Sequence, residues 1–315
     1  QAQGAFTAHP VAPLLSAAIG AADRSGMAPP GGQCVICFES TSQSAALPCS
    51  CNVQYCTRCW DRALAESFNA CDQARCPTCR FPVHVDYDHE RGCLLFSREA
   101  EDDRPAQPSA EEAQAIFARR RETVERLLEQ ARPMQIRLLR RYGAGQPELR
   151  KIAEGAEAYV NALPVEELRK LLASLTSISG EAPEVPADAP QDALARCLLE
   201  AAGCEGAVAA CWAAREQAMP SCVCGSTLRR VSRSERIHRI CESMFPGCPR
   251  EELWEIILSG QCDVICDICA NQVRTCSGVW TCDNGDSTIL HATAYDVCDA
   301  CFVANACREA SDCVG

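Results

Sequence analysis

The pattern of apolar and polar positions predicts that helices fill the middle of this 315-residue chain. A Ser-x-x-Glu capping box at Ser109 predicts the start of a helix, and apolar residues follow helical spacing from there to Ala131. Pro133 is expected to break or kink this helix, because proline lacks an N–H donor and its ring clashes with the preceding turn. A second helix, at residues 133–142, should end before Gly143, since glycine readily adopts the conformation of a helix C-cap.

Further helices are expected along the rest of the chain. A proline-rich loop at residues 180–190 separates them into two groups, because prolines interrupt helical hydrogen bonding. The apolar spacing places them at residues 147–161, 164–175, 192–202 and 204–219, and within 228–261. Cys197, Cys204 and Cys211 recur here at seven-residue steps, and we interpret them as small buried hydrophobic residues.

Near the N-terminus the pattern predicts one helix and one strand. Trp60, Leu64 and Phe68 recur every four residues, which places them on one face of a helix. Residues 81–87 alternate between apolar and polar side chains, as a half-buried strand does. Residues 1–32 are rich in Ala, Gly and Pro, so we expect a disordered leader there.

The cysteines change this picture, because the chain has 26 of them and many stand in closely spaced pairs. A short turn between two cysteines lets both thiolates point at one ion, and a tetrahedral zinc site needs four ligands. The first run of pairs is Cys34 with Cys37, Cys49 with Cys51, Cys56 with Cys59, and Cys76 with Cys79. These eight thiolates predict two closed, structural zinc sites.

This run of pairs resembles the RING finger family. The matching segments are Cys34-Val35-Ile36-Cys37, Leu47-Pro48-Cys49-Ser50-Cys51, Tyr55-Cys56-Thr57-Arg58-Cys59-Trp60 and Cys76-Pro77-Thr78-Cys79-Arg80. Cys51 stands where RING fingers usually have a His, and the Cys-x2-Cys-Trp step also resembles the first RING of RING-between-RING ligases. Ligand pairs alternate in a cross-brace in this family. The resemblance therefore implies one zinc ion on Cys34, Cys37, Cys56 and Cys59, and another on Cys49, Cys51, Cys76 and Cys79.

The resemblance implies an E3 ubiquitin ligase that acts as a scaffold. Such a ligase binds a ubiquitin-conjugating enzyme charged with ubiquitin and promotes transfer to a substrate lysine without a covalent intermediate. Ile36, Trp60 and Pro77 match or lie close to the family's contact positions for that enzyme. Arg80 matches the Arg that contacts both the enzyme and ubiquitin. Local core packing is the alternative for Ile36 and Trp60, and an ordinary exposed position is the alternative for Arg80.

A second group of cysteines follows the helical region. It consists of Cys222 with Cys224, Cys266 with Cys269, and Cys298 with Cys301, with Cys282 and His291 between the last two pairs. Two Cys-x2-Cys pairs are enough for one zinc site, and the remaining Cys222, Cys224, Cys282 and His291 are enough for a second. We therefore expect one or two zinc ions in this module, in addition to two in the N-terminal one.

Part of this group resembles the ZZ-type zinc finger, through Cys266-Asp267-Ile268-Cys269 and Tyr295-Asp296-Val297-Cys298-Asp299-Ala300-Cys301. The first and last pairs of that family share one zinc ion, which implies the ligand set Cys266, Cys269, Cys298 and Cys301. Cys222-x-Cys224-Gly225 also resembles a zinc-ribbon knuckle, which could pair with Cys266 and Cys269 instead. Some ZZ fingers hold peptide tails through acidic residues. Asp267, Asp296 and Asp299 are candidates for that role, with solvated surface as the alternative.

Composition and charge limit the classes of partner. The formal net charge of −12 argues against a nucleic-acid partner, and the faint resemblance of residues 164–202 to a DNA-binding SAP motif falls in an acidic segment. No apolar run approaches the ~20 residues that span a bilayer, so no membrane segment is expected. Cys-x2-Cys pairs are typical of metal sites in a reducing compartment, which predicts a cytoplasmic or nuclear protein.

Together the patterns predict small zinc-stabilised α+β modules joined by an all-α middle region. Aromatic residues make up only 5% of the chain, so metal is expected to replace part of the core in these modules. The expected parts are a leader at 1–32, a cross-brace RING at 33–96, a linker at 97–108, a helical region at 109–219, a ZZ-like or zinc-ribbon-like module at 220–305 and a tail at 306–315.

Three functions are compatible with this organisation. The first is the RING-type ligase, in which the C-terminal module recruits a protein substrate. The second is a non-catalytic zinc scaffold, in which both modules only bind partner proteins. The third is a RING-between-RING enzyme with a cysteine intermediate, against which the long helical spacer argues.

Overall fold

The computed structural model of the chain describes residues 32–41, 44–71, 73–98, 110–179, 185–213, 219–244, 247, 249, 252, 263–274, 277–291 and 294–307. The side chains at 110–117, 119, 120, 176–179, 244 and 286 are not included. The expected leader (apart from residue 32), most of the linker, the capping box at Ser109 and the tail beyond residue 307 lie outside the described residues.

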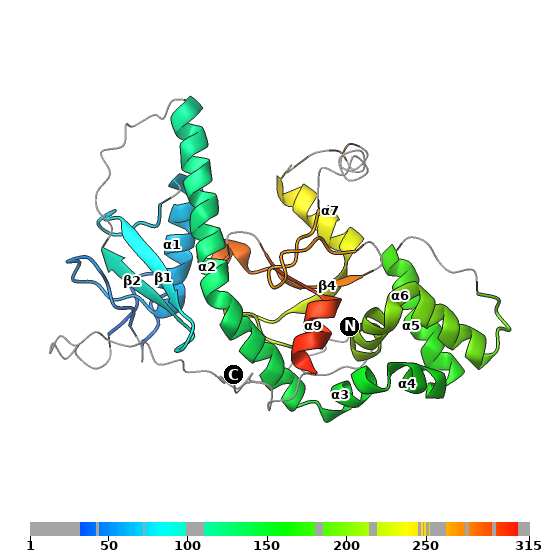
Figure 1. Cartoon of the computed structure of the whole chain (residues 1–315). Coiled ribbons are helices and arrows are strands. Elements are labelled where there is room, and N and C mark those ends of the chain that lie inside the picture. The colour runs from blue at the N-terminus through cyan, green and yellow to red at the C-terminus, as the bar shows by residue number, and fades with distance from the viewer. Residues whose placement is uncertain are drawn as a thin grey trace, which may run out of the picture.

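The N-terminal module consists of cysteine-rich loops, helix α1 and a β-hairpin (Figure 1). Helix α1 spans Thr57–Cys71, and its Trp60, Leu64 and Phe68 are all buried, as their spacing predicts. Strands β1 (Val83–Asp88) and β2 (Cys93–Arg98) pair antiparallel. Strand β1 confirms the predicted strand.

The hydrophobic pattern does not predict β2. Its apolar residues, Cys93 to Phe96, form a continuous run without the alternation that identifies a half-buried strand. The ring of Phe96 meets the ring of Trp60 edge to face, with centroids 5.9 Å apart. Strand β2 is therefore held by pairing with β1 and by packing on α1, and its last two residues fall within the segment expected to be a linker.

Helix α2 spans Ala110–Ala144 and lies between the N-terminal module and the rest of the chain (Figure 1). The predicted break at Pro133 is wrong, because one helix continues through it. Pro133 is exposed, whereas Ala131 and Gln135 on either side of it are fully buried, so packing on both sides holds the helix together. Gly143 lies inside α2, where a Cβ atom would collide with the carbonyl oxygen of Ala306.

Four helices form the middle of the chain, and the last three of them share a core made mainly of leucine and alanine side chains. They are α3 (Pro147–Glu154), α4 (Ala156–Ala162), α5 (Val165–Ser179) and α6 (Gln191–Ala213). The single helix predicted at 147–161 is divided at Gly155. Helix α6 has a kink at Gly203, which has a non-helical φ of 66°. The kink lies between the two helices that the sequence predicts there.

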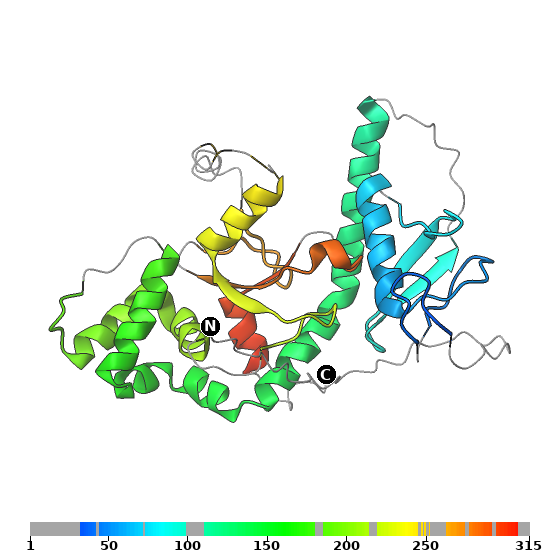
Figure 2. The same cartoon turned by 180° about the vertical axis from the view of Figure 1, so that it is seen from behind.

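The C-terminal part contains a three-stranded antiparallel sheet in the order β3-β4-β5. The strands are β3 (Arg229–Ser232), β4 (Gly278–Cys282) and β5 (Tyr295–Cys298), and the helices are α7 (Arg233–Met244), the 3-10 helix η1 (Gly285–Ser287) and α9 (Asp299–Ala306). The sheet lies between α7 and α9 (Figure 2). Residues 229–232, predicted to be helical, form a strand because they pair with β4. Most of residues 245–261 lie outside the described residues.

Two buried ion pairs hold this sheet to its helices. The guanidinium of Arg230 donates to both carboxylate oxygens of Asp299, at 3.0 and 2.7 Å, and both side chains are almost fully buried. Asp299 also accepts from the backbone N–H of Gly278 and from the indole N–H of Trp280. Arg236 of α7 donates to Asp296 of β5 at 2.9 Å. These Arg side chains therefore serve internal packing.

One apolar cluster extends across all of these parts. It contains Trp60 and Leu64 of α1, Leu139 of α2, and Trp280 and Phe302 of the C-terminal part. The rings of Trp280 and Phe302 stack with centroids 3.9 Å apart. The two cysteine-rich parts therefore share a core with α2. The C-terminal part also has a smaller apolar cluster of its own, which includes Val231, Ile237 and Val279.

The burial of the Arg230–Asp299 pair predicts a large effect of breaking it. Arg230→Met should destabilise the metal-loaded protein by about 3–5 kcal/mol, because it leaves a buried carboxylate without its cation. Arg62→Met is the matched control: Arg62 pairs with Glu66 on the surface of α1, so this change should cost less than about 1 kcal/mol. Urea unfolding measures both, and equal losses of stability would contradict the assignment.

Candidate metal centres

In the described part of the chain, Cys and His side chains gather in four groups whose ligand atoms lie within 4.8 Å of one another. They are site 1 (Cys34, Cys37, Cys56, Cys59), site 2 (Cys49, Cys51, Cys76, Cys79), site 3 (Cys222, Cys224, Cys282, His291) and site 4 (Cys266, Cys269, Cys298, Cys301). Each group offers four donors that could hold one metal ion. Because Cys222 and Cys224 lie in site 3, they do not form the alternative zinc-ribbon pairing with Cys266 and Cys269.

Four of the ligand pairs lie on the same kind of tight turn. In each turn the backbone N–H of the residue after the second cysteine donates to the carbonyl of the first cysteine, at 2.8–2.9 Å. That residue takes a positive φ in every case: Phe38 at 60°, Arg80 at 60°, Gly225 at 83° and Ala270 at 56°. Three of these are not glycine, and the left-handed conformation costs such residues about 1–2 kcal/mol. Backbone strain of this kind collects at functional sites, and here it points both thiols of a pair at one centre.

Two other pairs lie at the start of a helix. Cys56 and Cys59 flank the first turn of α1, and the N–H of Cys59 lies 3.4 Å from the sulfur of Cys56. Cys298 caps α9 in the same way, with the N–H of Cys301 3.4 Å from its sulfur. A helix N-terminus favours negative charge and so favours the thiolate form. Sites 1 and 4 are thus built alike, from one turn and one helix start.

The distances within the groups fit a tetrahedral ion. Four ligands at ~2.3 Å from a zinc-like ion would lie ~3.8 Å from one another. The sulfur atoms of Cys37 and Cys56 are 4.0 Å apart, and those of Cys224 and Cys282 are 3.6 Å apart. No disulfide joins the cysteines that the structure describes. The donor sets, four thiols or three thiols and an imidazole, are those that soft tetrahedral metal ions prefer.

Electrostatics also favours a cation in these groups. Desolvation and the neighbouring thiols of site 1 raise the pKa of Cys59 to about 12. Hydrogen bonding with Cys266 is the first cause that raises the pKa of Cys298 to about 12. Four adjacent thiols therefore resist full ionisation by themselves, and a bound cation removes that repulsion.

Site 3 is the most enclosed of the four groups. Cys222, Cys282 and His291 are each no more than 1% exposed, and the imidazole Nε2 of His291 lies 3.6 Å from the sulfur of Cys222. The carboxyl group of Asp61 in α1 lies beside the loop that carries His291, and desolvation raises its pKa to about 6. An ion in site 3 would therefore be shielded from solvent by side chains from both halves of the molecule.

The contact candidates of the N-terminal module differ in exposure. Ile36 is 44% exposed, and Val35 and Phe38 beside it are 43% and 68% exposed. Arg80 is exposed and Pro77 is half-buried. Trp60 is fully buried between Tyr55 and Phe96, so the alternative of core packing holds for it, and it offers no surface to a partner.

The exposure of Val35 and Phe38 was not predicted. Both residues are apolar and stand inside or directly after the first metal-binding turn. Because that turn directs its two sulfur atoms inward, the side chains between and after them are left on the outside. An apolar residue between or directly after the cysteines of a Cys-x2-Cys turn is therefore a sequence signal for an exposed apolar side chain.

The three candidate acidic residues of the C-terminal part do not form a peptide-binding surface. Asp296 and Asp299 are buried and bind Arg236 and Arg230. The carboxylate of Asp267 accepts from the backbone N–H of Asp296 at 2.6 Å, and burial raises its pKa to about 8. The surface interpretation fails for Asp296 and Asp299 as well, because their carboxylates hold the sheet and helices together.

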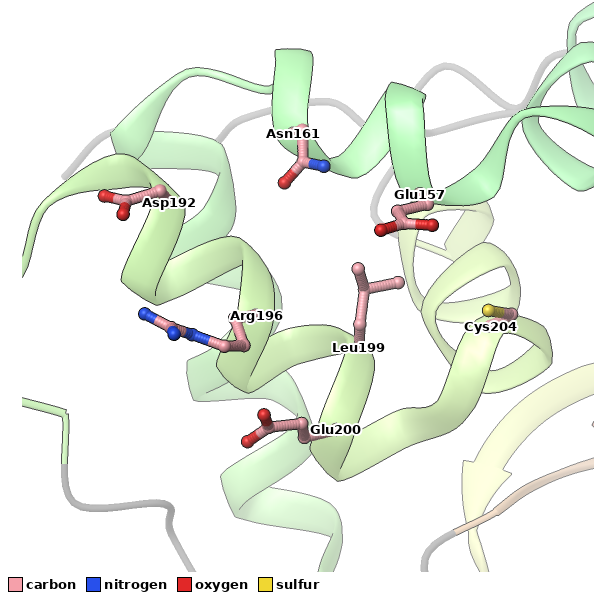
Figure 3. A pocket seen from close by; sticks show the side chains of 7 residues that line it. All are labelled: Glu157, Asn161, Asp192, Arg196, Leu199, Glu200 and Cys204. Atoms are coloured by element: carbon pink, nitrogen blue, oxygen red, sulfur yellow. The ribbon is translucent and has the colours of Figure 1, made fainter.

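An open hollow of about 540 Å³ lies between α4 and α6 (Figure 3). Its lining side chains carry mixed charge: Glu157, Asp192, Arg196 and Glu200, with Asn161, Leu199 and Cys204. Cys204 is exposed and Cys197 is half-buried, so the interpretation as buried residues holds only for Cys211. The hollow contains no group of metal ligands.

Comparison of the chain with protein-family models, with curated proteins and with solved structures found no match. Among the described residues, no helix has both the length and the apolar character that crossing a bilayer requires. The function must therefore be inferred from the chain's own sites.

Four separate sites predict the stoichiometry of metal binding. Native mass spectrometry of protein refolded with zinc should show four ions per chain, and Cys37→Ser and Cys269→Ser should each remove one. Stripping the metal should unfold the cysteine-rich parts, because such small modules obtain much of their folding energy from the metal. Circular dichroism should retain the signal of α5 and α6, whose core contains no ligand. Three ions or fewer would contradict this prediction.

Proposed function

We propose that this chain is a zinc protein whose N-terminal module is a RING-type finger, and that it acts as an E3 ubiquitin ligase. The observation that carries the proposal is the alternation of sites 1 and 2 along the chain, with exposed Ile36 inside the first turn and exposed Arg80 directly after the last ligand. This is the cross-brace arrangement that the RING resemblance implies. The C-terminal module, with its ZZ-like site 4, would recruit the protein substrate.

In this proposal zinc supplies folding energy and no catalytic chemistry, because all four coordination positions of each site are filled by protein ligands. The exposed apolar side chains Val35, Ile36 and Phe38 offer a binding surface for a ubiquitin-conjugating enzyme. Arg80 comes directly after Cys79, the last ligand of site 2. Its guanidinium offers a rigid fork of donors that can contact both that enzyme and ubiquitin. The substrate lysine then attacks the thioester of the conjugating enzyme, and no intermediate forms on this chain.

A non-catalytic zinc scaffold is the second candidate. The burial of Trp60 favours it, because that burial removes one of the four expected contacts with the conjugating enzyme. The same exposed residues would then bind a different protein, and both modules would only bring partners together.

An in vitro autoubiquitination assay with a broad panel of conjugating enzymes tests the proposal. Ile36→Ala and Arg80→Ala should each lower the rate about tenfold, since a central interface contact is worth about 1–2 kcal/mol. Ile265→Ala and Arg121→Ala are matched controls, because both residues are exposed and lie outside the N-terminal module. They should leave the rate unchanged.

Each outcome of this assay selects one function. A wild-type chain that transfers no ubiquitin with any conjugating enzyme, while holding its zinc, would support the scaffold. A thioester trapped on a cysteine after Cys222 would support a RING-between-RING mechanism. Equal losses of rate in the variants and their controls would remove Ile36 and Arg80 from the contact surface.

A further inference from the structure

Site 3 depends on the N-terminal half of the chain at two places. The first is the loop that carries its His291 ligand. The backbone N–H of Ile289, two residues before His291, donates to Oδ1 of Asp61 at 2.9 Å. Asp61 lies on α1, two residues after Cys59 of site 1. One hydrogen bond thus joins the helix that starts at a site 1 ligand to the loop that ends at a site 3 ligand.

The second place is the turn that carries Cys222 and Cys224. Gln135 of α2 is fully buried, and its amide makes two hydrogen bonds with this turn. Its Nε2 donates to the carbonyl of Ser221 at 3.0 Å, and its Oε1 accepts from the N–H of Val223 at 3.1 Å. Because both polar atoms of the amide are paired, the side chain fixes the turn without leaving a buried group unsatisfied.

Helix α2 holds the N-terminal module with the same kind of contact. Gln130 accepts from the backbone N–H of Tyr87 in β1 at 3.1 Å, and Arg126 donates to the carbonyl of Val85 at 2.9 Å. Gln130 and Gln135 are five residues apart on one helix. The backbones of β1 and of the Cys222–Cys224 turn are therefore attached to neighbouring turns of α2.

We propose that site 3 is a metal-dependent clamp that joins the N-terminal module to the C-terminal module, with Asp61 and Gln135 as its positioning residues. A metal ion there ties together three segments: the turn held by α2, strand β4 through Cys282, and the loop held by α1. Without the ion, nothing holds the three thiols and the imidazole together. The turn attached to Gln135 and the loop attached to Asp61 are then no longer fixed relative to each other. The inference rests on the zinc binding in the proposed function and is independent of ubiquitin transfer.

Coupling of this kind is reciprocal, so it can be tested from both ends. Asp61→Ala and Gln135→Ala should weaken metal binding at site 3 about tenfold, because each removes hydrogen bonds that hold a ligand-carrying backbone segment in place. Glu66→Ala on α1 and Glu129→Ala on α2 are the controls, since both glutamates are exposed. Asp61→Asn should restore binding, because its amide oxygen can still accept from Ile289.

Native mass spectrometry of the full chain, titrated with a competing zinc chelator, gives the first readout. Both alanine variants should fall to three zinc ions at a chelator concentration that leaves the wild type, Asp61→Asn and the controls with four. Cys282→Ser identifies the lost ion: combined with Asp61→Ala it should lose no ion beyond the one that Cys282→Ser loses alone. Alanine variants that keep four ions as tightly as the wild type would overturn the proposal, as would a double variant that retains only two.

Hydrogen exchange of Cys282→Ser tests the coupling from the other end. Amide exchange should rise about tenfold or more in α1 and at Ile289, and it should stay unchanged in α5, whose core is separate. Unchanged exchange in α1 would show that site 3 is only a local fold element. A wild type that binds three ions or fewer would overturn the zinc assignment and the clamp together, whereas a failed ubiquitination assay would leave the clamp intact.

Discussion

The direction of paired thiols determines how the rest of this structure is arranged. Four tight turns, each followed by a residue at positive φ, and two helix starts bring the sulfur atoms to common centres. The chain has few aromatic residues for a large apolar core, so a metal bond is the strongest interaction available to loops of this size. The strain at Phe38, Arg80 and Ala270 would be small beside the binding energy of a structural metal ion in these sites.

Helix α2 connects these local turns to one another across the molecule. It contacts β1 through Gln130, the turn of site 3 through Gln135, and α9 through the close approach at Gly143. Its continuity through Pro133 is essential to this role, because a sharp break would separate Gln130 from Gln135. The shared apolar cluster has the same consequence. The cysteine-rich parts are therefore packed on one helix and on one shared apolar cluster.

Local signals carried most of what the sequence could predict. Cysteine spacing predicted the ligand pairs, because a Cys-x2-Cys turn depends on only a few neighbouring residues. The RING and ZZ resemblances implied how those pairs combine into the sets that the structure brings together. The spacing of Trp60, Leu64 and Phe68 predicted α1 for the same reason. The errors concern tertiary contacts: β3 forms by pairing with β4, and α2 continues because both sides of Pro133 are packed. Strand β2, which the pattern did not predict, packs the ring of Phe96 against Trp60. Asp299 and Asp296 looked exposed because their arginine partners lie about 60–70 residues away in sequence.

The order of the ligands explains why site 3 was the hardest set to assign. In both modules the ligand pairs of two sites alternate along the chain, and one site combines a turn with a helix start. In the N-terminal module the remaining turn, Cys76–Cys79, follows the helix start, whereas its counterpart, Cys222–Cys224, precedes every other ligand of the C-terminal module. The sites thus alternate in both modules, although the turns and the helix start follow one another in a different order along the chain. The order of the cysteine pairs pointed to both ligand sets of the first module but to only one of the two in the second. Ligand geometry detects both, because a metal ion constrains the positions of its donors in space and places no constraint on their order in the chain.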